Sequence, residues 1–111
     1  MYKYGKVKAP PLLIVVAGDL KECPEKAGLM HTLSCAAENI LLAVESLSLG
    51  GVWLYVYDDE EPEVEERVKD ILSIPEEMLV VCMLPIGSPD KDKETKNLSR
   101  DGLHFNKWEK L

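Results

Sequence analysis

One stretch of the chain decides the fold: residues 33–57, which read LSCAAENILLAVESLSLGGVWLYVY. Between residues 33 and 47, apolar side chains recur at the three- and four-residue spacing of an amphipathic helix. Residues 52–57 are mostly β-branched or aromatic and favour a strand. Gly50-Gly51 stands between the two segments, and we expect it to end the helix, because glycine accepts the left-handed conformation past a helix end. The stretch therefore predicts a helix that leads directly into a strand.

A second apolar run precedes this stretch. Residues 12–17 are all apolar, and their length and the glycine that follows them indicate a strand buried on both faces. Residues 18–30 contain two glycines and a proline, so we expect a loop there. Thr32 or Ser34 is then the predicted cap of the helix, because a hydroxyl can accept a hydrogen bond from a first-turn N–H.

The stretch is followed by a second helix and a third strand. Acidic residues precede Pro62, and both features are typical of a helix start. Apolar residues then recur at helical spacing until Pro75, which we expect to close this helix. Residues 78–84 form a third apolar run, and Pro85 and Gly87 are expected to end the strand. The order of elements predicts an α/β chain.

The character of the sequence changes after residue 88. Residues 90–100 are largely charged and have no apolar period, which predicts an exposed arm. Residues 103–108 alternate apolar and polar side chains and include a phenylalanine and a tryptophan. A tail of this kind suggests docking on a second subunit. We therefore expect one domain over residues 1–111, in which residues 88–111 are a charged arm and docking tail.

Charge and composition exclude several classes of protein. The net charge is −7, and residues 58–77 hold ten acidic residues against Arg67 and Lys69, a local charge of −8. An acidic surface disfavours nucleic acid, because phosphate contacts need basic side chains. No apolar run is long enough to span a bilayer, and no signal peptide is evident, so we expect a cytoplasmic protein without a membrane partner.

Motifs that carry chemistry are few. The three cysteines show no CxxC spacing and no zinc pattern, so free cysteines and no metal site are expected. The chain has no GxGxxG, no GxxxxGK[ST] and no GxSxG motif. His31 and Cys35 are either a Cys–His nucleophilic pair or a loop histidine and a core cysteine. No catalytic side chain is predicted from the residues themselves.

The order and the residues of four segments and a tail resemble the FMN-dependent nitroreductase family. These are segments 9–17, 34–43, 47–57 and 74–89 and the tail 104–108. The resemblance covers nearly the whole chain. It implies an α+β fold with a three-layer arrangement of a sheet and helices, shortened at the N-terminus, and a C-terminal tail swapped onto a partner subunit. It also implies a homodimer with FMN, in which NAD(P)H delivers hydride to the flavin for a nitro, quinone or similar acceptor. Because the cofactor carries this chemistry, no catalytic triad is needed.

The resemblance places the flavin ring beside one strand. The segment Trp53, Leu54, Tyr55, Val56 matches the strand whose backbone passes the flavin, where an N–H can approach the reactive ring nitrogen. Tyr55 stands where many members of the family have glycine, and a tyrosine there either crowds the ring or stacks near it. An ordinary sheet strand with aromatic packing is the other interpretation of this segment.

The resemblance places the FMN phosphate near the charged arm. Lys96 and Arg100 fall where the family has a basic residue on the phosphate, and the fork of a guanidinium suits phosphate oxygens. The helix-rich N-terminal segment of the family, with its Arg-Arg-Ser type motif, has no match. Three hypotheses therefore stand: an FMN-binding oxidoreductase, a non-catalytic remnant or partner subunit that dimerises without FMN, and an unrelated small-molecule-binding α/β module.

Overall fold

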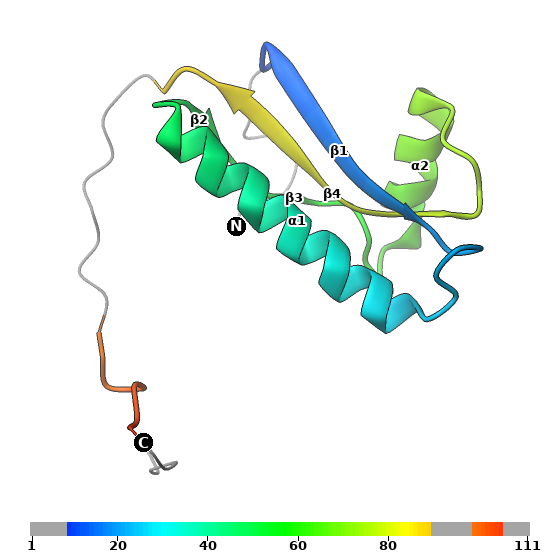
Figure 1. The fold of residues 1–111 in the computed structure, drawn as a ribbon. Helices are drawn as coiled ribbons and strands as arrows, with labels where there is room; N and C mark the ends of the chain where they lie inside the picture. Colours follow the sequence, from blue (N-terminus) through cyan, green and yellow to red (C-terminus); the bar gives the residue numbers. More distant parts are fainter. Residues whose placement is uncertain (1–8, 90–98, 106–111) are drawn as a thin grey trace.

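The computed structural model describes residues 9–89 and 99–105. In these residues four strands and two helices follow one another along the chain (Figure 1). They are β1 (Leu12–Asp19), α1 (Lys26–Ser46), β2 (Gly50–Gly51), β3 (Leu54–Tyr55), α2 (Pro62–Leu72) and β4 (Met78–Gly87).

The strands form one antiparallel sheet around β4. One edge of β4 pairs with β1, from Leu12 opposite Ile86 to Asp19 opposite Met78. The other edge pairs with β2 and then with β3. Helix α1 runs along one face of the sheet (Figure 1). Helices combined with an antiparallel sheet confirm the predicted α+β class.

The prediction that residues 12–17 are buried on both faces is wrong. β1 is paired on one side only, and Leu12 and Leu13 are 52% and 43% exposed. The covered strand is β4, in which Leu79, Val80 and Leu84 are almost completely buried. An apolar run predicts a strand, but whether that strand is central or at an edge of the sheet depends on pairing with distant segments.

Helix α1 begins earlier than predicted. It starts at Lys26, and β1 continues to Asp19, so only residues 20–25 of the expected loop over residues 18–30 lie outside strands and helices. Gly28 lies inside α1. Thr32 does not cap the helix, because its hydroxyl donates to the carbonyl of Gly28 at 3.1 Å within the first turns. Ser34 also lies in the helix interior. The packing of this segment on the sheet outweighs the modest helix-weakening effect of one glycine.

The glycine pair has a different role from the predicted one. Ser48, with φ 57°, takes the left-handed conformation after α1, while Gly50 and Gly51 form β2 opposite Gly87 and Ile86. A Cβ on Gly51 would lie 3.1 Å from a methyl carbon of Leu41. The glycine therefore permits a close approach between the sheet and α1.

The other helix and strand boundaries agree only in part with those predicted from the sequence. α2 starts at Pro62 as predicted but ends at Leu72, where Ser73 turns left-handed (φ 56°) before Pro75. Only Leu54–Tyr55 of the predicted strand 52–57 pairs as a strand, and β4 continues through Pro85 to Gly87. β4 has its bulge opposite Val16 and Ala17, where the register skips one residue.

The length of α1 also corrects an expectation about membranes. Its 21 residues, with mean hydropathy 1.3, are enough by length and composition to cross a membrane, although no such segment was predicted. The earlier start at Lys26 creates this length. A single helix of this kind is weak evidence for a membrane, because core helices of soluble proteins and signal sequences meet the same criterion.

Candidate functional site

The strand predicted to lie beside a flavin is at the edge of the sheet. β3 pairs with β4 through Leu54 opposite Met83 and Tyr55 opposite Cys82. Alternation along the strand buries Leu54 and Val56, while Tyr55 is 47% exposed. Trp53 is half-buried and packs against the core cluster beneath α1. No described strand pairs with the outer side of β3, so some of its backbone groups face outwards there.

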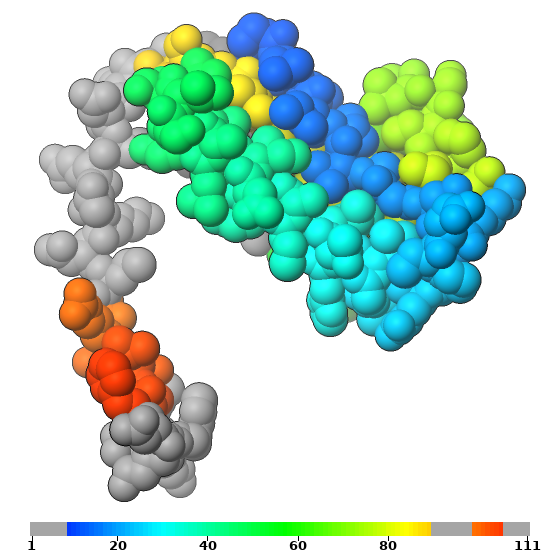
Figure 2. Space-filling model, in the orientation of Figure 1, coloured from blue at the N-terminus to red at the C-terminus, as the bar shows by residue number. Residues whose placement is uncertain are grey.

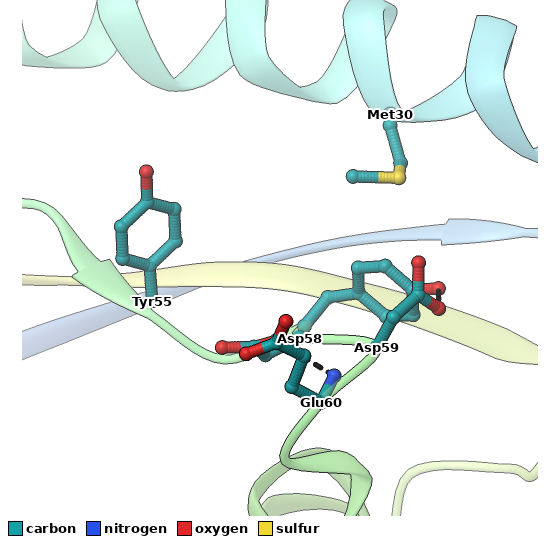
Figure 3. Close-up of a pocket in the computed structure, with 6 residues that line it drawn as sticks. Met30, Tyr55, Asp58, Asp59 and Glu60 are labelled. Carbon is teal, nitrogen blue, oxygen red and sulfur yellow. Dashed lines mark hydrogen bonds between the residues drawn. The ribbon is translucent and has the colours of Figure 1, made fainter.

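A pocket of about 400 Å³ opens beside this strand (Figure 3). Met30 reaches into it from α1, and the ring of Tyr55 points from β3 towards that helix. The other lining residues come from the connection that leads to α2: Tyr57, Asp58, Asp59 and Glu60. The volume falls in the lower part of the range of about 300–1,000 Å³ that small-molecule sites occupy.

Local hydrogen bonds order the acidic side of the pocket. Asp58 accepts a hydrogen bond from the backbone N–H of Glu60 at 2.8 Å. The hydroxyl of Tyr57 donates to Asp59. The Nζ of Lys26 lies 4.3 Å from the centre of the Tyr57 ring, a cation–π contact. Hydrogen bonding to Tyr57, followed by the negative charge nearby, raises the pKa of Lys26 above its ordinary value. The rim therefore carries three carboxylates and one ammonium group that is already engaged.

One polar atom near this strand has no partner. The Nε1 of Trp53 is buried, and nothing in the described part of the chain accepts a hydrogen bond from it. A buried indole N–H normally finds an acceptor. Water, a ligand or another polypeptide can therefore supply an acceptor at this point.

We tested the described residues for their fit to FMN. The edge strand and the Tyr55 ring fit a planar ring, whereas the indole N–H of Trp53 is buried and does not belong to the pocket lining. The phosphate does not fit the pocket, because Asp58, Asp59 and Glu60 would repel its charge. The predicted phosphate ligands are not brought to this place: Arg100 is exposed on a segment that lies away from the sheet in Figure 1, and Lys96 lies outside the described residues.

Sequence reasoning missed most of the pocket. Met30 was assigned to a loop, and the acidic run was interpreted as a solvated helix face. The usable signal was the alternation of aromatic residues at positions 53, 55 and 57, which predicts one shared face. The partner of that face on α1 could not be deduced from spacing.

Other candidate groups do not form a second site. His31 and Cys35 lie in α1 and are both exposed, so His31 is not in a loop and Cys35 is not in the core. All three cysteines are free, as predicted. Among residues 9–89 and 99–105, no three His, Cys, Asp or Glu side chains are placed to hold a metal ion.

The chain belongs to the nitroreductase family, whose model matches residues 2–88. This membership excludes an unrelated α/β module. A candidate NADH dehydrogenase/NAD(P)H nitroreductase of Methanothermobacter thermautotrophicus is 36% identical over 97% of this chain and 56% of its own length. The chain thus spans about half the length of the curated relatives it matches.

Solved structures agree with the family fold. A candidate NADH dehydrogenase/NAD(P)H nitroreductase from Parabacteroides distasonis superposes with a TM-score of 0.78 and 32% identity, over 89% of this chain and 57% of that one. An FMN-dependent nitroreductase from Clostridium difficile superposes with a TM-score of 0.74 and 30% identity, over 89% and 59%. The family fold expected from the four segments is therefore confirmed.

Proposed function

We propose that this chain acts as an FMN-dependent oxidoreductase that takes hydride from NAD(P)H and reduces a nitro, quinone or similar acceptor. The observation that carries the proposal is the edge strand Trp53–Val56, which borders a pocket in a chain of the nitroreductase family. Similar chains include candidate NAD(P)H nitroreductases and an FMN-dependent nitroreductase. Bound flavin would supply the hydride chemistry, and the protein would supply binding and orientation.

The residues of this chain would hold the ring end of the flavin. The outward side of β3 offers backbone hydrogen-bonding groups, and Tyr55 offers an aromatic ring. Leu54 and Val56 are buried and keep the strand in place. A basic side chain for the phosphate must come from elsewhere: from Lys96 or Arg100 in the arm, or from another polypeptide.

A homodimer would complete the site. α1 is uncovered on one face of the molecule (Figure 2). Leu42 in this helix and Leu47 just after its end are 60% and 69% exposed. Leu103 and Phe105, at the start of the predicted docking tail, are 58% and 79% exposed. Apolar side chains exposed in this number favour burial against a second subunit. In this proposal the α1 surfaces meet and the tails cross to the partner.

The first test is an absorbance spectrum of the purified full chain after incubation with FMN and gel filtration. We expect a flavin band at about 450 nm that elutes with a dimer-sized peak. Arg100→Gln should weaken FMN retention, whereas Lys91→Gln, a basic position of the same arm not expected to contact the phosphate, should not. A colourless dimer that releases all added FMN would contradict the proposal.

A second candidate is a non-catalytic subunit that keeps the fold and the dimer interface without FMN. The acidic lining of the pocket and the position of Tyr55 in it favour this candidate, because both reduce the room and the charge match for FMN. Oxidation of NADH or NADPH by the purified chain, with added FMN and a quinone, would rule it out. Absence of turnover together with absence of bound flavin would support it.

A further inference from the structure

The two tyrosines of the pocket differ in what already contacts them. The ring of Tyr57 lies beneath the ammonium group of Lys26, and its hydroxyl donates to Asp59. Tyr55 is 47% exposed, and its hydroxyl has no hydrogen-bond partner among the described residues. Tyr55 therefore leaves an aromatic face and a hydroxyl free for a ligand.

The wall opposite Tyr55 is suited to a flat ring. Met30 extends from α1 into the same pocket, and Figure 3 shows its thioether group above the Asp59 end, to one side of Tyr55. Thioether sulfur and aromatic rings both make favourable contacts with π systems. A planar ligand can enter between α1 and β3 and contact both side chains.

The charge of the pocket limits which kinds of ring can bind there. The carboxylates of Asp58, Asp59 and Glu60 line one side of the pocket. Asp58 and Asp59 each accept one local hydrogen bond and keep further acceptor capacity. The ammonium group of Lys26 offsets part of this charge at the Tyr57 ring, so the ring of Tyr55 is the aromatic face left for a ligand. An anionic ring would meet three negative charges at the same place.

We propose that this pocket selects flat aromatic rings that carry a positive charge, such as pyridinium rings, over neutral and anionic rings of the same size. The inference goes beyond the proposed function, because the nitro and quinone acceptors proposed there are uncharged, and it concerns the pocket of the flavin-free chain, which a flavin ring would otherwise occupy. Binding of such a ring does not require flavin, so the two proposals can fail separately.

The test uses three probes of nearly equal shape: the 1-methylnicotinamide cation, neutral nicotinamide and the nicotinate anion. Dissociation constants are measured with the full chain by NMR titration. We expect the cation to bind about two- to fivefold more tightly than the neutral ring, and the anion to bind most weakly. Tyr55→Ala should weaken all three probes, whereas Tyr55→Phe should keep the ring contact.

Charge variants separate local selection from the overall acidity of the chain. The double variant Asp58→Asn with Asp59→Asn keeps acceptors for the Glu60 N–H and the Tyr57 hydroxyl but removes two charges at the pocket. The control, Glu66→Gln with Asp70→Asn, removes two charges from exposed positions of α2 that do not line the pocket. We expect only the first pair to abolish the preference for the cation.

Equal affinity for the three probes, no saturable binding of any of them, or the same loss in both double variants would overturn this inference. A colourless protein that still prefers the cation would contradict FMN binding and leave the selectivity intact. A protein that retains flavin but does not distinguish the probes would contradict the selectivity alone.

Discussion

The two helices are attached to the same sheet in opposite ways. α1 buries Leu29, Ala37 and Val44 and carries apolar side chains on its outer side as well. α2 is acidic on its exposed side and is held by a polar contact, in which Glu65 and Lys69 join β4. The exposed side of α2 is mostly acidic, with Ile71 and Leu72 exposed at its C-terminal end, whereas the exposed side of α1 carries fewer charges and includes Leu42. We therefore expect the exposed side of α1, and not that of α2, to be covered by a second subunit.

The attachment of α2 depends on one carboxylate. Glu65 lies 3.2 Å from the Nζ of Lys69, and its other oxygen accepts the backbone N–H of Val80 at 3.0 Å. Lys69 also donates to the carbonyl of Glu76 at 3.0 Å. The two charged side chains are only 15% and 7% exposed, so the contact is largely shielded from water. Glu65 thus satisfies the N–H of Val80, a residue for which the described residues give a strand partner in β1 but none in β2 or β3.

Breaking this contact should have the largest effect. We expect Glu65→Ala to lower the free energy of unfolding by roughly 3–5 kcal/mol, because it leaves the buried ammonium and the strand N–H without their partner. Urea denaturation measures the change. Glu66→Ala, at an exposed neighbouring position, is the control and should have little effect. A loss below about 1 kcal/mol for Glu65→Ala would show that apolar contacts hold α2.

The attachment of α1 should be sensitive to volume. Ala37 is completely buried between α1 and the sheet. We expect Ala37→Leu to destabilise the fold by about 1–3 kcal/mol, because a larger side chain overpacks a tight contact. Ala36→Leu, the same change at the exposed adjacent position, should be nearly neutral in the thermal unfolding of the chain. Equal effects of the two substitutions would contradict the observed orientation of α1.

The sheet beneath α1 should respond to alkaline pH. Burial raises the pKa of the Cys82 thiol from 9.0 to about 11, so between these values the unfolded chain loses a proton that the folded chain keeps. Because the unfolded state then binds fewer protons, stability falls as the pH rises.

At about pH 10 the contribution of Cys82 should be a loss of about 1.4 kcal/mol relative to pH 8. Cys82→Ala should remove this part of the pH dependence, although it lowers stability at every pH. Chemical denaturation of both proteins at the two pH values measures the difference. Parallel pH profiles would mean that the thiol does not contribute.

The existence of the elements could be predicted from local patterns, whereas their partners could not. Pro62 marked the start of α2 correctly, because proline suits the first helical turn. Gly28 misled the prediction for α1, since glycine is a breaker only where packing does not compensate. The central position of β4 depends on pairing with β1, near the N-terminus, and with β2 and β3, from the middle of the chain.

For the candidate site, too, single residues could be predicted from the sequence, whereas contacts between distant segments could not. Tyr55 was identified through family resemblance, and the structure places it in a pocket. Met30 was missed, because only the packing of α1 on the sheet brings it into the same pocket as Tyr55. Glu65 was counted in an acidic surface, since sequence spacing cannot show that an i,i+4 pair is buried.

The smallest effect on stability tests the comparison between the helices most directly. Leu42 on α1 is 60% exposed, and Ile71 on α2 is 74% exposed. Leu42→Glu and Ile71→Glu make the same chemical change, and neither should alter the stability of one subunit by more than about 0.5 kcal/mol. If the outer side of α1 joins two subunits, Leu42→Glu places charges in that interface and shifts the chain to monomer, whereas Ile71→Glu does not. Sedimentation equilibrium measures both masses. A wild-type monomer, or dissociation by Ile71→Glu alone, would mean that α1 does not form the interface and that its apolar surface is covered in another way.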